Sequence, residues 1–65
     1  MDLTKEERYE LCDMGYYNDV IRGYLIAAMQ DADFSRKDIN SVLGALRGVF
    51  DTTSAEEADA IWQKY

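Results

Sequence analysis

Helix-capping patterns recur along this proline-free chain and constrain what it can fold into. A serine or threonine followed three residues later by an acidic residue is typical of a helix start, because both side chains can bond backbone N–H groups that the first turn leaves free. The pattern occurs at Thr4 with Glu7, at Ser35 with Asp38, and near residue 54 as Thr53 with Glu56 or Ser54 with Glu57. Few segments alternate between apolar and polar residues, so strands are not favoured. The sequence predicts an all-α fold.

The predicted helices form a compact bundle and span about residues 5–14, 19–32, 36–50 and 54–64. Gly15 can adopt the left-handed conformation that ends the first helix. We expect Asn18 to be the N-cap of the second helix, with Asp19 in its first turn, where negative charge is favourable. The third helix has the strongest amphipathic pattern, because its apolar residues recur at helical spacing.

Apolar residues at helical spacing give the predicted core: Leu11, Val20, Ile21, Tyr24, Leu25, Ala28, Ile39, Val42, Leu43, Leu46, Phe50, Ile61 and Trp62. In the last helix, Ala55, Ala58 and Tyr65 are expected to face inward as well. Ile26 falls among the solvent-facing residues of the second helix, so either another helix covers it or it is left for a partner. Tyr9 and Tyr16 lie away from the apolar stripes and are predicted to be exposed.

The 65 residues correspond to a single domain, 1–65, that is expected to bury only about 60% of its unfolded surface. The single cysteine, Cys12, cannot form a disulfide within the chain, which suits a reducing cytoplasm. The longest apolar run, YLIAAM, is far too short to cross a bilayer, so we expect no membrane contact.

The net charge of −6 disfavours direct binding to DNA or RNA, since phosphate binding depends on clustered Lys and Arg. Acidic residues are spread over the first and last helices: Glu6, Glu7, Glu10, Asp13, Glu56, Glu57 and Asp59. Such a surface can occupy a basic groove and mimic nucleic acid, inhibiting a DNA- or RNA-handling enzyme of the kind that anti-CRISPR and anti-restriction proteins target. It can equally serve only to keep the protein soluble.

The sequence contains few residue patterns that are typical of a catalytic site. There is no histidine for a Cys–His or Ser–His pair, and no Gly-rich phosphate loop, so we expect neither an enzyme nor a cofactor. Residues 31–35, DADFS, begin like the calcium loop of EF-hand proteins. The loop then departs from that pattern, because Arg36 replaces the glycine of the sharp turn and Val42 replaces the bidentate glutamate. A degenerate calcium site is therefore an alternative to helix capping for this segment. We predict no metal ligand in the chain.

Small residues on the third helix suggest a contact surface. Ser41, Gly44 and Gly48 form a smooth strip opposite its apolar stripe, and a glycine inside a helix costs roughly 1 kcal/mol relative to alanine. Close approach of another helix would offset this cost. That helix could belong to a twofold mate, a partner protein or the last helix of this chain. We predict a partner-binding surface that combines this strip with Arg22, Ile26 and Tyr16.

The stretch ERYELCDMGYYNDVIRGYLIAAM, residues 7–29, resembles small helical accessory proteins encoded by mobile elements and phages of Gram-positive bacteria. The resemblance implies a regulator or inhibitor that binds host or defence proteins, as anti-CRISPR proteins do. It assigns no functional residue. Together with the residue patterns, it predicts a small acidic module that binds a protein partner, with a homodimer as one form of that contact.

Overall fold

Four helices make up the computed structural model, which describes residues 2–65. They are α1 (Lys5–Asp13), α2 (Asn18–Asp31), α3 (Arg36–Thr52) and α4 (Ala55–Lys64). No strand occurs within the described residues. The predicted all-α fold, a small bundle of four helices, is confirmed, and its bounds agree with the prediction to within two residues at each helix end.

The capping patterns mark three of the helix starts. Complete capping boxes join Thr4 to Glu7 and Ser54 to Glu57, so that Ser54 and not Thr53 caps α4. The Ser35 hydroxyl accepts a hydrogen bond from the backbone N–H of Asp38. The prediction for α2 was wrong, because Asn18 is its first helical residue and Tyr17 occupies the cap position without a side-chain bond.

Left-handed residues end α1 and α2 in the same way. Gly15 has φ +82° and Asp33 has φ +64°. After each of these residues, the next backbone N–H reaches five residues back, from Tyr16 to the Leu11 carbonyl and from Phe34 to the Met29 carbonyl. These bonds define Schellman motifs, which satisfy carbonyl groups that the helix end leaves free.

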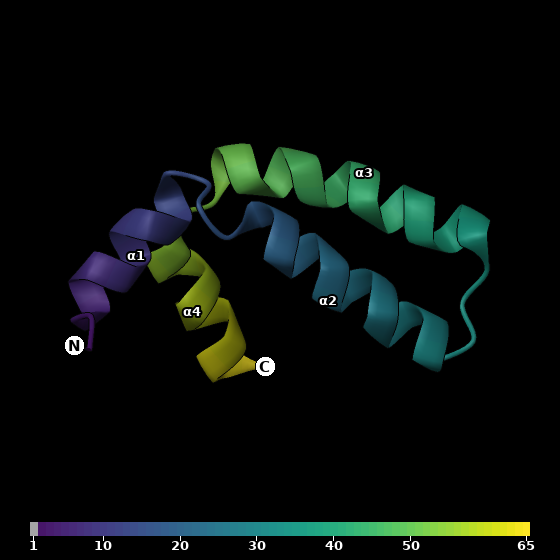
Figure 1. Ribbon diagram of the computed structural model, residues 1–65, viewed down its shortest axis with the longest axis horizontal. Coiled ribbons are helices and arrows are strands. Elements are labelled where there is room, and N and C mark those ends of the chain that lie inside the picture. Colours follow the sequence, from purple (N-terminus) through teal and green to yellow (C-terminus); the bar gives the residue numbers. More distant parts are fainter. Residues whose placement is uncertain (1) are drawn as a thin grey trace.

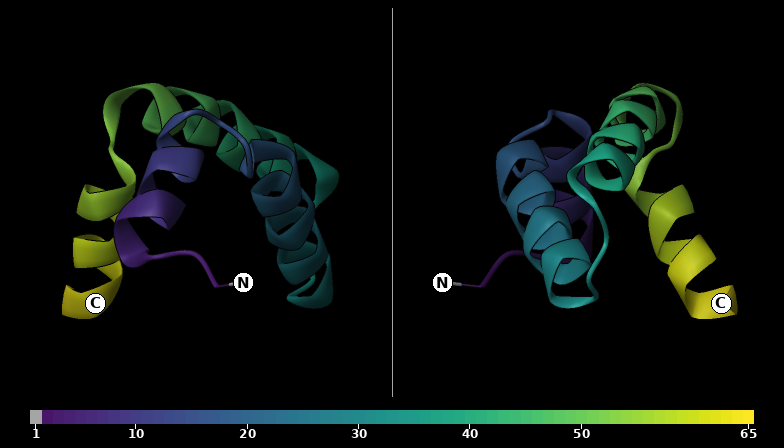
Figure 2. Two further views of the ribbon diagram at one scale, coloured as in Figure 1. Left: turned by 60° about the vertical axis from the view of Figure 1, so that its left-hand side comes forward. Right: turned by 90° about the vertical axis from the view of Figure 1, so that its right-hand side faces the viewer.

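The helices associate as two pairs set at an angle to each other. α1 packs with α4, and α2 packs antiparallel with α3 (Figure 1). The further views show an arch: α3 lies at the top, along the arch in the left view and nearly end-on in the right view, and α2 and α4 descend on either side (Figure 2). The radius of gyration is 13.1 Å, whereas a typical folded domain of this length has about 10.8 Å. The arch therefore leaves its two sides apart.

The core between the helices is small, and several predicted core residues lie outside it. Among the described residues only Met29 and Ile39 are buried, with 9% and 7% of their surface exposed. Of the predicted core, Leu11, Leu25, Leu43, Leu46 and Phe50 are half-buried. The prediction was wrong for Val20, Ile21, Tyr24, Ala28, Val42, Ile61 and Trp62, which are exposed, and likewise for the inward placement of Ala58 and Tyr65.

On α2 these errors arise because apolar residues cover more of the helix circumference than one neighbouring helix can bury. A helix turns 100° per residue, so residues that lie around Met29 point toward α3 while Val20 and Tyr24 point nearly the opposite way. One neighbouring helix covers one side only. Because α4 packs on α1 instead of on α2, the second side of α2 has no cover.

Polar groups form the contact between α1 and α4. The Tyr9 hydroxyl donates a hydrogen bond to Asp59, and Lys5 lies 3.8 Å from the same carboxylate. The Asp13 carboxylate accepts a hydrogen bond of 2.7 Å from the backbone N–H of Ala55 at the start of α4. Tyr9 is therefore half-buried, not exposed as predicted. Because α4 uses its polar side here, its apolar side is turned away from the pair.

Candidate functional site

Two helix sides, one on α2 and one on α4, have no other helix packed on them among the described residues 2–65. On α2 the surface is formed by the exposed residues Val20, Ile21, Tyr24, Ala27 and Ala28, which share one side of the helix; it is bordered by the half-buried Tyr17 at the start of the helix and by Asp31 at its end. Tyr24 exposes 75% of its surface and Val20 exposes 54%. Large apolar side chains are seldom left in water to this extent on one helix side, so this surface is a candidate for contact with another molecule.

The matching surface on α4 is formed by Ala58, Ile61, Trp62 and Tyr65, spaced at i, i+3, i+4 and i+7. Trp62 is the single tryptophan of the chain, and 74% of its surface is exposed. Ile61 and Tyr65 are exposed as well. No charged residue interrupts this stripe, because Asp59 and Gln63 project toward α1 on the other side of the helix.

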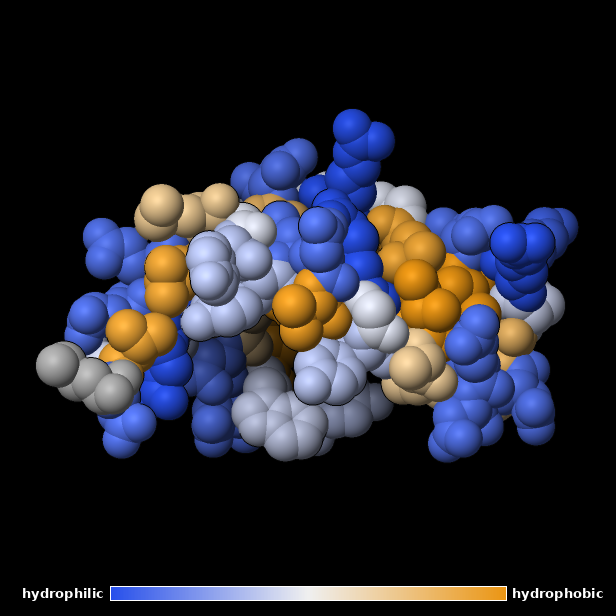
Figure 3. Space-filling view, in the orientation of Figure 1, coloured by the Kyte–Doolittle hydropathy of each residue, from blue (hydrophilic) through white to orange (hydrophobic). Residues whose placement is uncertain are grey.

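We refer to these two surfaces together as the apolar face. Figure 3 shows pale aromatic rings beside orange aliphatic side chains in the lower middle of the side it presents, with blue hydrophilic side chains toward both ends. Aromatic residues are enriched at protein interfaces, since they bury a large area at low entropic cost. The residues of this face recur at helical spacing in the sequence. Such periodicity alone does not distinguish a helix side that is buried from one that has no neighbour.

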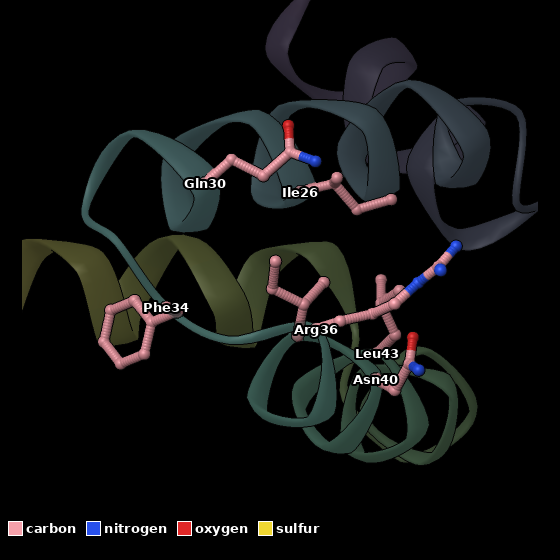
Figure 4. Close-up of a pocket in the computed structure, with 7 residues that line it drawn as sticks. Ile26, Gln30, Phe34, Arg36, Asn40 and Leu43 are labelled. Atoms are coloured by element: carbon pink, nitrogen blue, oxygen red, sulfur yellow. The ribbon is translucent and has the colours of Figure 1, made fainter.

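Arg22 and Ile26, predicted to bind a partner, lie between α2 and α3. Ile26 lines a groove with Gln30 from α2 and with Arg36, Asn40 and Leu43 from α3 (Figure 4). The guanidinium of Arg22 lies 5.3 Å from the centre of the Phe50 ring, a cation–π contact, and donates a 2.8 Å hydrogen bond to Asp19. Ile26 is half-buried beside α3 and borders the groove, so it stays a predicted partner residue.

The Ser41, Gly44 and Gly48 strip lies on a different side of α3 from this groove. A Cβ atom added at Gly44 or Gly48 would meet nothing within 4 Å, so no helix of this chain packs against the strip. Tyr16, the other predicted partner residue, is exposed and makes an edge-to-face contact with Tyr17, with ring centres 4.9 Å apart. The predicted partner residues therefore do not form one continuous surface.

Four of the seven acidic residues on α1 and α4 are engaged in bonds within the chain. Backbone hydrogen bonds from Thr4 and Ser54 hold the pKa of Glu7 and Glu57 below the ordinary value of 4.5. The hydrogen bond from Tyr9 lowers the pKa of Asp59 and raises that of Tyr9. The Asp13 carboxylate accepts a hydrogen bond from the first turn of α4. Among these seven residues, Glu6, Glu10 and Glu56 are the ones not described as bonded within the chain.

The segment that resembles a calcium loop serves as the connection between α2 and α3. Asp33 is the left-handed residue that follows α2, and Ser35 caps α3. Within residues 2–65 no three acidic, cysteine or histidine side chains converge in a way that could hold a metal ion.

Comparisons with protein-family models, curated proteins and solved structures find no match to this chain. In the part of the chain that the structure describes, no helix has the length and apolar character needed to cross a membrane.

Proposed function

We propose that this protein is a small acidic protein-binding module that acts as a regulator or inhibitor through helix-mediated contact. One observation carries the proposal. The chain exposes 5676 Å² at a mass of 7.5 kDa, whereas a folded monomer of this mass exposes about 4,250 Å². The surplus is large for so small a domain, and it includes the aromatic residues of the apolar face. A protein partner that covers this face would supply the missing burial.

The acidic nucleic-acid mimic is the weaker alternative. A mimic presents carboxylates that are free to replace phosphates in a basic groove. Glu7 and Glu57 are held in capping boxes, and Asp13 and Asp59 join α1 to α4. The apolar face has one carboxylate at its edge, that of Asp31 at the end of α2, so contact through this face draws mainly on desolvation of aromatic and aliphatic side chains.

The proposed role requires no catalytic group and no cofactor. Its proposed setting is the cytoplasm, where the single cysteine, Cys12, stays reduced. The resemblance of residues 7–29 to accessory proteins of phages and mobile elements adds a class of partner, namely host or defence proteins.

Variant-dependent capture from extracts of the producing cells tests this function. Tyr24→Glu and Trp62→Glu should each remove the captured protein, because a charge would be desolvated in the contact. Lys37→Gln is the matched control, since it changes the net charge by the same one unit at an exposed position on α3. Equal capture by all variants would refute the role of the apolar face.

A salt titration separates the two functions. Contact through the apolar face should respond weakly to ionic strength, whereas a mimic should release its target as salt rises. Neutralising Glu6, Glu10 and Glu56 to glutamine should leave capture unchanged. Loss of capture in that triple variant, together with strong salt dependence, would establish the mimic instead.

A further inference from the structure

We infer that the apolar face is covered by a second copy of this chain, in a twofold dimer that places α4 of each copy against α2 of the other. The inference rests on the proposed function, because it names the partner of the same surface. Three features of the molecule support it: the area to be covered, the distribution of charge, and the placement of the two surfaces on the arch.

The area favours an obligate dimer. Each chain exposes about 1,400 Å² more than a folded monomer of its mass. If two copies regained the burial typical of their mass by associating, their interface would cover about 2,800 Å², within the range of about 2,000–5,000 Å² found for obligate homodimers. A transient partner of standard size covers only about 800 Å² on each side and would leave much of the surplus in water.

The charge distribution permits self-association despite the net charge of −6 on each copy. Like charges facing each other across an interface oppose binding, so a self-complementary surface must be free of them. The residues of both stripes are uncharged, and the one acidic residue that shares the α2 side is Asp31, at the last position of the helix. Apolar burial can therefore proceed with the Asp31 carboxylate at the edge of the interface, in contact with water.

The arch determines which surfaces meet. Within one chain α2 and α4 descend on different sides of the arch and do not pack on each other (Figure 2). In a twofold interface a contact between residue i of one copy and residue j of the other occurs twice. Placing Trp62 of one copy against Tyr24 of the other therefore covers both stripes in both copies.

Trp62 provides a built-in probe, since it is the single tryptophan and is exposed in one copy. Light scattering after size exclusion should give twice the 7.5 kDa mass. On dilution to the monomer, Trp62 emission should move to longer wavelength.

Tyr24→Glu should give the monomer mass and the long-wavelength emission at every concentration, although residue 24 lies on the other helix. Lys37→Gln should behave like the unmodified chain, and circular dichroism should show unchanged helix content.

Small-angle scattering completes the test. A monomer mass at all concentrations, with Trp62 emitting at long wavelength, overturns the dimer. A monomer mass with short-wavelength emission and a radius of gyration below 13.1 Å also overturns it, because the arch then closes on itself. If Tyr24→Glu unfolds, the dilution series of the unmodified chain still decides. Variant-sensitive capture of another protein by a monomeric chain would refute the dimer and leave the proposed function standing.

Discussion

At the scale of single residues, a few side chains combine local and long-range roles. Asp33 adopts a left-handed conformation that glycine accepts more readily than any other residue. Tyr9, in the middle of α1, reaches Asp59 in the middle of α4. The first feature follows from the local end of a helix, while the second requires two segments far apart in sequence to meet.

Asp33→Gly should stabilise the protein by about 0.5–1 kcal/mol, because it relieves the left-handed strain of a residue with a Cβ atom. Urea denaturation followed by circular dichroism measures the change. The matched control is Asp31→Gly at the last residue of α2, which has helical conformation and should lose stability. Destabilisation by Asp33→Gly would show that the aspartate side chain contributes more than its backbone conformation costs.

Tyr9→Phe should raise the pKa of Asp59 toward its ordinary value of 3.8, because the hydroxyl bond is the largest cause of the lowering. A carboxyl group with a lowered pKa stabilises the fold above its ordinary value, and this contribution is lost as pH falls through the lowered pKa. The variant should therefore lose less stability below pH 3.8 than the unmodified chain. Titration of the Asp59 carboxyl by NMR checks the shift, and an unchanged pKa would contradict the bond.

At the scale of helices, caps and packing surfaces follow different rules. The starts of α1, α3 and α4 are bonded by Thr4, Ser35 and Ser54, within three residues of the helix they begin. The side on which a helix packs depends on its neighbours. α4 turns its polar side to α1, and α3 turns Ile39 toward α2 while its glycine strip stays in open space.

Gly44→Ala and Gly48→Ala should each stabilise the protein by about 1 kcal/mol, since alanine favours the helix and the added methyl meets no atom. Thermal and urea denaturation measure the gain. Gly15→Ala provides the contrast and should destabilise, because Gly15 has φ +82°. A loss of stability at Gly44 or Gly48 would show that another helix approaches the strip closely, as a partner would.

At the scale of the whole molecule, two helix pairs meet in an arch with little shared core. Met29 and Ile39 are the buried side chains among those described, so most apolar contacts are made at half-exposed positions. A domain of this size has little stability in reserve when its core is small. In the proposed dimer, association would therefore couple directly to folding.

The melting temperature of the chain should rise with protein concentration, because dimer formation stabilises the folded state by mass action. Differential scanning calorimetry over a hundredfold range of concentration measures the effect. Trp62→Glu should melt at a lower temperature that no longer depends on concentration. A concentration-independent melting temperature in the unmodified chain would contradict coupled folding and association.

The four helices and most of their ends follow from the sequence alone. Thr4, Gly15 and Ser54 act on backbone groups only a few residues away, so their effects can be derived without knowing the fold. The absence of proline and the recurrence of apolar residues at helical spacing were enough for the fold class and for helix bounds within two residues.

Which apolar residues are buried depends instead on how the helices pack together. Val20 and Tyr24 satisfy the same helical periodicity as Met29, and the periodicity does not state which side receives a neighbour. That choice depends on long-range contacts, namely the hydrogen bond from Tyr9 to Asp59 and the bond from Ala55 to Asp13, which hold α4 on α1. Because these polar contacts direct α4 away from α2, the predicted core residues Tyr24 and Trp62 become the candidate binding surface.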